Sequence, residues 1–209
     1  GGNKANLTIT QNTTINLNGH TLTISEAGQY FEVQNGATLT IEDSHKDSQA
    51  PQETVSTDNK LRRYGNTASL SEDGSSLTYY ITKSEANGTS TTETLEMHEV
   101  PLNNAGKILC QGTSDQRTSE QLIKVQNGGK LVLESGVLQN TGGKHVVYVD
   151  GGKVNNENGE TVDRETLTMT GGYIVGGGRD GDPGGGIYVQ SGKVNIQGGV
   201  VAANRGSSG

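Results

Sequence analysis

The chain has 209 residues, of which 32 are glycine, 29% are hydrophobic, one is phenylalanine and none is tryptophan, and so small an apolar content cannot fill the thick core of an ordinary globule. Its 16 basic and 23 acidic residues leave a net charge of −7, which argues against nucleic acid and anionic membranes as partners, because both attract basic surfaces. The single cysteine, Cys110, permits no internal disulfide and is expected to be a small buried residue.

Three short runs of alternating aliphatic and polar residues lie near the start of the chain. They occupy residues 7–10, 14–17 and 21–24 and are separated by Q-N at 11–12 and N-G at 18–19. Apolar side chains at every second position predict β-strands. We therefore expect these three strands to form one complete coil of a repeating structure. No run of about 18 apolar residues, which a membrane-spanning helix needs, occurs anywhere in the chain.

A four-residue phrase recurs after this first coil, and each copy precedes another aliphatic strand. Its copies are V-Q-N-G at 33–36, V-Q-N-G at 125–128, V-D-G-G at 149–152 and V-Q-S-G at 189–192. Val125 and Val149 are 24 residues apart, and Val149 and Val189 are 40 apart, which is the same 24 plus 16 inserted residues. We place a smaller inserted loop at residues 155–168.

A period near 24 built from short strands, with glycine and asparagine at the corners, predicts a parallel β-solenoid with three strands per coil. Each inward aliphatic side chain would then lie above its counterpart, at about 4.8 Å per coil, and form a narrow core. The alignment predicts two inward ladders, made of Val33, Val125, Val149 and Val189 on one face and Leu39, Leu131, Val154 and Val194 on the next.

The repeat stops between residues 43 and 106, which we interpret as an inserted lobe. These 64 residues contain four of the 32 glycines and ten acidic against five basic residues. Within them, residues 77–82 and 91–100 look like two strands joined across N-G at 87–88, a plausible hairpin. We expect the hairpin to fold against one flank of the coils.

Loops carried by a rigid solenoid often hold function, so the lobe is the first place to look for a ligand site. Tyrosine rings can stack on sugars and arginine can bind carboxylates. The alternative is that Tyr79 or Tyr80 only covers the flank of the solenoid, and the absence of tryptophan weakens a carbohydrate platform. The candidate ligand-binding residues are Arg62, Arg63, Tyr64, Tyr79 and Tyr80.

Two segments resemble a known family. The sequence I-N-L-N-G-H-T-L-T-I at 15–24, and G-G-I-Y-V at 185–189 leading to G-G-V-V-A-A-N at 198–204, are similar to the right-handed parallel β-helix repeats of the pectate-lyase-like superfamily in large bacterial surface proteins and adhesins. The resemblance covers residues 3–42 and 107–209. It implies an all-β, right-handed parallel β-helix with one inserted hairpin-containing lobe, a single solenoid domain over 1–209, further coils of the same polypeptide after Gly209, and an extracellular place on a bacterial cell surface.

Residues that would carry chemistry are sparse. The D-D, G-H-G and R-I-K motifs of the pectin-hydrolysing relatives are absent. Asp180 and Asp182 are weak metal candidates, because two carboxylates fall short of the six to eight oxygens that Ca²⁺ requires. His20, His45, His98 and His145 share no spacing with a nucleophile. We expect no cofactor and no metal site.

The sequence therefore predicts a non-catalytic module of the cell surface, serving adhesion or ligand display, with a host or environmental glycan or a surface protein as its partner. The competing hypothesis is a polysaccharide lyase or glycoside hydrolase of the β-helix class. That hypothesis requires acidic and basic side chains clustered on one face of the solenoid.

Overall fold

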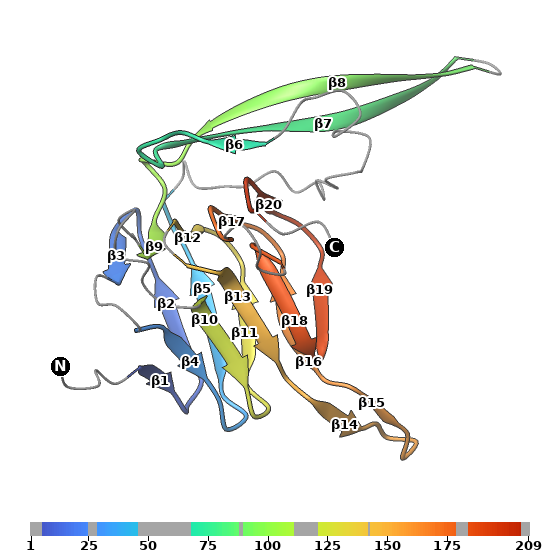
Figure 1. The fold of residues 1–209 in the computed structure, drawn as a ribbon. Helices are drawn as coiled ribbons and strands as arrows, with labels where there is room; N and C mark the ends of the chain where they lie inside the picture. Colours follow the sequence, from blue (N-terminus) through green and yellow to red (C-terminus); the bar gives the residue numbers. More distant parts are fainter. Residues whose placement is uncertain are drawn as a thin grey trace.

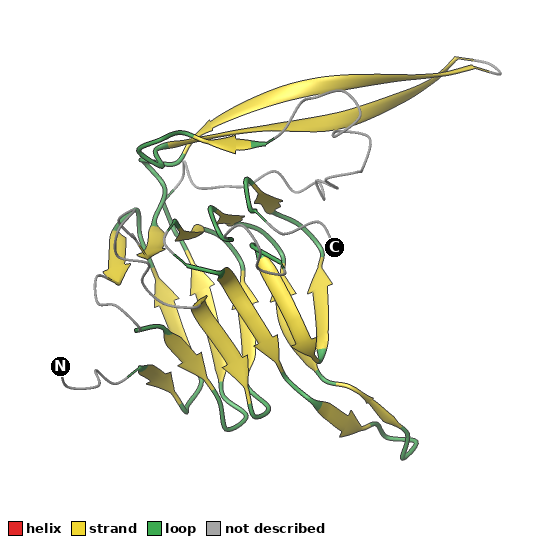
Figure 2. Ribbon diagram, viewed as in Figure 1, coloured by secondary structure: helices red, strands yellow, loops and turns green. Residues whose placement is uncertain are grey.

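The computed structural model describes residues 6–24, 29–45, 68–87, 90–110, 121–141, 143–178 and 184–205. In these ranges the chain forms β-strands and no helix, so none of the described elements is a helix that could span a membrane. Figure 1 and Figure 2 show a stack of short strands with two excursions, one above the stack and one at its lower corner. The expectation of an all-β fold is confirmed.

Three five-stranded parallel sheets make up the stack. In chain order, sheet A contains β1 (Leu7–Ile9), β4 (Phe31–Val33), β10 (Gln121–Gln126), β13 (His145–Asp150) and β18 (Ile187–Ser191). Sheet B contains β2 (Thr13–Asn16), β5 (Thr38–Glu42), β11 (Lys130–Leu133), β16 (Glu165–Met169) and β19 (Lys193–Ile196). Sheet C contains β3 (Thr21–Ile24), β9 (Lys107–Cys110), β12 (Val137–Asn140), β17 (Tyr173–Val175) and β20 (Val200–Ala202).

The chain passes from sheet A to sheet B to sheet C and then repeats, which gives five coils. The three runs expected to form a first coil are β1, β2 and β3, one in each sheet. The register pairs Ile9 with Val33, Val33 with Val125, and Val125 with Val149. The recurring valine thus occupies the same position in successive coils, as the sequence alignment required.

The V-Q-N-G phrase is the corner between sheets A and B. In the second coil Asn35 and Gly36 both have positive φ, of 59° and 76°, and the amide of Ala37 donates to the carbonyl of Gln34 across 3.1 Å. Two successive residues with positive φ inside such a bond match a type I′ turn, which favours Asn-Gly. The third coil repeats this corner with Asn127 and Gly128. The Asn-Gly form of the phrase therefore marks this sharp turn in the second and third coils, whereas in the later copies only the last glycine, Gly152 or Gly192, has positive φ.

An inner core of aliphatic side chains fills the space between the three sheets. Val33, Val125 and Val149 are fully buried on the sheet A side, as predicted, and Leu39 and Leu131 on the sheet B side. Cys110 is also buried there, so its expected role as a small core residue is confirmed.

Of the predicted ladder residues, Val154 lies elsewhere and Val189 is exposed. Val154 belongs to β14 (Lys153–Asn155), which pairs with β15 (Thr161–Asp163) in a separate antiparallel hairpin, and Leu167 takes the inward position between Leu131 and Val194. The excursion thus runs through 153–163, whereas residues 165–168 of the expected loop belong to strand β16 of sheet B. Val189 has the expected register but is 46% exposed, because its coil is the last of the stack and only one neighbouring coil covers it.

The larger excursion leaves after β5 and returns at β9. Its described strands are β6 (Ser69–Leu70), β7 (Ser76–Asn87) and β8 (Ser90–Pro101), and β7 and β8 form the long antiparallel hairpin that crosses above the stack in Figure 1. Leu77 and Tyr79 of β7 are buried against the outer face of sheet C. The outer surface of sheet C contributes Val137, Tyr173, Val175, Val200 and Ala202 to this second cluster.

A buried carboxylate fixes the point where this excursion leaves and returns. Asp43 is 2% exposed, and its two oxygens accept hydrogen bonds from the amides of Gly19 at 2.7 Å and Gly106 at 2.6 Å. Its own amide donates to the Ser135 hydroxyl at 2.7 Å. Asp43 thereby joins the first coil, the returning chain and the third coil at one corner.

Candidate functional site

The outer face of sheet A carries one residue per coil at equivalent positions. Because side chains alternate along a strand, the residue just before each inward Ile or Val points outward. These residues form what we name the sheet A ladder, which consists of Thr8, Glu32, Lys124, Tyr148 and Tyr188. All are exposed or half-buried, whereas the inward neighbours of Lys124 and Tyr148 are fully buried.

The last three coils contribute an aromatic and cationic group to this face. The Tyr148 and Tyr188 ring centroids are 5.4 Å apart, and His145 stacks on Tyr188 with a centroid separation of 4.8 Å and an interplanar angle of 16°. The Lys124 ammonium lies 5.6 Å from the centroid of the Tyr148 ring, within the range of a cation–π interaction. The rings are therefore held in place by one another and by Lys124.

Hydrogen bonds fix the groups around these rings. The His145 Nδ1 atom is hydrogen-bonded to the carbonyl oxygen of Gly184, and the Tyr188 hydroxyl donates to Gln190 at 3.1 Å. In the neighbouring coils, the Gln126 amide donates to the Glu32 carboxylate. A ligand on this face would meet tyrosine edges, amides and one ammonium group, a combination suited to hydrogen bonding with neutral polar groups such as sugar hydroxyls.

The sequence contained a signal for this face that the search for motifs missed. In the last four coils each ladder residue comes directly before the valine that begins the repeated phrase, and in the first coil Thr8 comes before Ile9, which pairs with Val33. An alignment of the phrases therefore also aligns the ladder residues. Tyr148 precedes Val149 and Tyr188 precedes Val189, which places two of the seven tyrosines in adjacent coils. Recurrence of one residue type at one outward position was the available clue.

The residues that the sequence singled out are placed differently. Arg62, Arg63 and Tyr64 lie outside the described residues. Tyr79 is 1% exposed, and its ring stacks on His98 with centroids 5.3 Å apart. Burial raises the pKa of Tyr79. Its ring thus covers the flank of sheet C, which is the alternative role considered for it.

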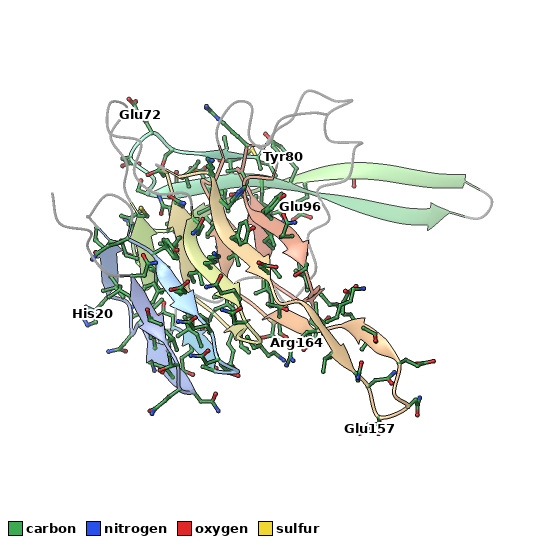
Figure 3. All side chains as sticks on the ribbon, turned by 60° about the horizontal axis from the view of Figure 1, so that its bottom comes forward. His20, Glu72, Tyr80, Glu96, Glu157 and Arg164 are labelled. Atoms are coloured by element: carbon green, nitrogen blue, oxygen red, sulfur yellow. The ribbon has the colours of Figure 1, made fainter. Side chains whose placement is uncertain are left out.

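Tyr80 is half-buried and points to the other side of the hairpin, opposite Met97 in the register of β7 and β8. Figure 3 labels it on the hairpin, together with Glu96. Because the hairpin packs on sheet C, the structure brings neither Tyr79 nor Tyr80 to the sheet A ladder.

Metal ligands are not gathered in the described ranges. No group of three or more His, Cys, Asp or Glu side chains there could hold a metal ion. Asp180 and Asp182 lie outside these ranges. On the hairpin, His98 Nε2 and Glu96 Oε1 are 3.4 Å apart, and two ligands do not make a structural metal site.

Two carboxylates away from sheet A, Glu165 and Asp73, are engaged as hydrogen-bond acceptors. Glu165 on sheet B accepts from Lys130 at 2.7 Å and from Thr168 at 2.8 Å, and these bonds hold its pKa below the usual value. Hydrogen bonds from Ser75 and Ser71 lower the pKa of Asp73 to about 2. A carboxyl group with a lowered pKa is ionised near neutral pH and cannot serve there as a general acid.

Comparisons with known proteins return no match, whether the chain is compared with models of protein families, with curated proteins or with solved structures. The parallel three-sheet architecture is compatible with the β-helix resemblance carried by the repeats.

Proposed function

We propose that this chain is a non-catalytic binding module of the right-handed parallel β-helix class, displayed on a bacterial cell surface, and that it recognises a glycan through the sheet A ladder. The observation that carries the proposal is the cluster of Lys124, Tyr148 and Tyr188 on one sheet face, with the buried His145 stacked on Tyr188. Aromatic side chains that are both half-exposed and held rigid bind at a low cost in conformational entropy.

The spacing of the ladder supports an extended ligand. Stacked coils present side chains at equivalent positions about every 4.8 Å along the stack, so an oligomer lying along this axis meets one outward side chain at each coil, a tyrosine in each of the last two. Hydroxyl, amide and ammonium groups next to apolar ring edges match the mixed polar and apolar surface of a sugar. The same regularity gives no preference for one particular sugar.

The lyase or hydrolase alternative has no such support. In the described ranges the carboxylates of Glu32 and Glu165 are each bound by a neighbouring donor. A hydrolase of this class needs two carboxyl groups facing one glycosidic bond, one of them with a raised pKa. On sheet B, Glu42 and Glu165 lie on β5 and β16, and Glu165 is held by Lys130 and Thr168.

A glycan array probed with the native chain and a Tyr148→Ala/Tyr188→Ala double variant tests the proposal. Losing two aromatic contacts should weaken binding roughly 10- to 100-fold. Tyr80→Ala is the matched control, since it removes a half-buried tyrosine from the hairpin and should leave binding unchanged. Equal binding by the native chain and the double variant, or no binding to any glycan by the native chain, would contradict the proposal.

A further inference from the structure

Basic side chains gather at the corner between sheets A and B, at the base of the β14–β15 hairpin. Arg164 lies between β15 and β16, and its guanidinium reaches back over the preceding coil, where its Cζ is 3.6 Å from the position that a Cβ on Gly128 would occupy. Figure 3 shows Arg164 at the base of the hairpin and Glu157 at the hairpin's far end. Because Gly128 has no side chain, the Arg164 guanidinium can lie close to the backbone of this corner.

Two of the acidic groups at this corner, Glu165 and Asp163, are paired with lysines. Lys130 binds Glu165 at 2.7 Å, and Lys153 lies 3.4 Å from Asp163. Lys193 is aligned with Glu165 across adjacent strands but forms no ion pair within the described ranges. Arg164 likewise has no side-chain hydrogen bond or ion pair there. Among the residues that the structure describes, Arg164 and Lys193 are therefore without an ion-pair partner, in a chain whose net charge is −7.

Arg164 is not an ordinary solvated arginine. The residue is half-buried, and its Nε atom is buried without a hydrogen-bond partner. A buried N–H group without a partner is unfavourable, and a carboxylate or sulfate that accepts from the solvent-facing part of the guanidinium would supply the charge partner that Arg164 lacks. A bound oxyanion would therefore stabilise Arg164 relative to the unliganded corner.

This corner adjoins the sheet A ladder. Strand β13 carries Tyr148 and ends two residues later at Asp150, beside the corner glycines 151 and 152. Two residues of extended strand span about 7 Å, less than the length of a disaccharide. Asp150 accepts from the Ser191 hydroxyl at 2.7 Å. The Arg164 amide donates to the Gly152 carbonyl at this corner across 3.0 Å, so a ligand that runs from the tyrosines past Asp150 approaches Arg164.

We propose that Arg164 binds a carboxylate or sulfate group carried by the glycan that lies on the sheet A ladder. This inference rests on the proposed function and adds the chemical class of the ligand. The negative charge of the chain as a whole opposes dense polyanions, so the ligand is a mostly neutral glycan with an isolated acidic group.

Nuclear magnetic resonance of the arginine Nε–Hε groups tests the oxyanion site directly. We expect sodium acetate or sodium sulfate to shift the Arg164 signal saturably, relative to sodium chloride at the same ionic strength. Exposed Arg205 supplies the control signal and should not shift in this way. No saturable change at Arg164, or an equal change at Arg205, would overturn the site.

Matched glycans test the ligand class. Lactose, 3′-sialyllactose and 3′-sulfated lactose differ in whether they carry no acid, a carboxylate or a sulfate, and the same comparison applies to acidic and neutral members of any glycan pair that the array detects. The native chain should bind the acidic member about 10-fold more tightly, Arg164→Gln should remove this preference, and Arg164→Lys should restore only part of it.

The two proposals fail in different ways. Glycan binding that needs Tyr148 and Tyr188 but shows no preference for the acidic member, or a preference that survives in Arg164→Gln, overturns the inference and leaves the proposed function in place. Absence of all glycan binding overturns the proposed function and the assignment of a glycan to Arg164. Unchanged circular dichroism and melting temperature of Arg164→Gln show that any loss of preference is not a loss of fold.

Discussion

The inner core of the coils and the cluster beneath the hairpin are both apolar, but they are assembled in different ways. Inside the coils, each buried residue lies against its equivalent in the next coil, as Leu39, Leu131 and Leu167 do. Beneath the hairpin, Leu77 and Tyr79 of an excursion cover Val137 and Tyr173, which lie on the outer face of sheet C. A repeated core follows from the period, whereas the second cluster depends on how one particular excursion folds back.

The largest effect is expected in the inner core. Leu131→Ala removes a fully buried side chain from the central coil, and such truncations cost about 2–5 kcal/mol of unfolding free energy. Val132→Ala, on the same strand but on its outer face, should cost far less. Urea unfolding followed by circular dichroism measures both, and similar losses for the two variants would refute the assignment of inner and outer faces.

A smaller and more local effect is expected beneath the hairpin. Leu77→Ala also empties a buried site, but the hairpin can move to close part of the cavity, so we expect about 2 kcal/mol, the lower end of the range for such truncations. Hydrogen exchange should speed up in β7 and β12 and stay slow in β11. Equal acceleration in β11 would mean that the hairpin and the coils unfold as one unit.

The smallest effect concerns the loop that leads into the hairpin. Hydrogen bonds from Ser75 and Ser71 lower the pKa of Asp73 from 3.8 to about 2. Because the folded pKa is depressed, this carboxylate stabilises the fold above about pH 4 and the contribution is lost as the pH falls towards 2.

Thermal melting of the native chain and of Asp73→Asn between pH 2 and pH 6 measures this contribution. The native chain should lose more of its melting temperature on acidification than the variant does. Glu72→Gln, a change at the exposed neighbouring position, serves as the control and should follow the native chain. Parallel curves for the native chain and Asp73→Asn would show that Asp73 does not stabilise the loop.

Much of the fold could be predicted because the period, the corners and the alternation of residues all repeat. The prediction that Val154 lies in the inward ladder is wrong. Val154 follows a copy of the phrase, but the chain forms the β14–β15 hairpin there, and the strand of sheet B begins only at Glu165. Sequence spacing alone placed the 16 inserted residues after Val154, and only the pairing of β14 with β15 reveals where they begin.

The apolar outer face of sheet C also had a signal in the sequence. Residues 137–138, 173–175 and 200–202 are apolar at consecutive positions, which is typical of strands buried on both faces. The identity of the covering segment could not be derived in this way, because contact between Tyr79 and Tyr173 joins parts of the chain that share no period. The ladder residues could be found by aligning the phrases. The ion pair between Lys130 and Glu165 could not, because it depends on which residues of β11 and β16 lie side by side in sheet B.

The type I′ corner between sheets A and B has a consequence for how binding specificity can change. Since each corner and each inward residue is set within its own coil, the outward ladder residue of that coil can be exchanged without altering the register of its neighbours. Glutamate, lysine and tyrosine already occupy this one position in different coils. Substitutions at this position can therefore change the binding specificity of one coil at a time, while the backbone of the stack stays the same.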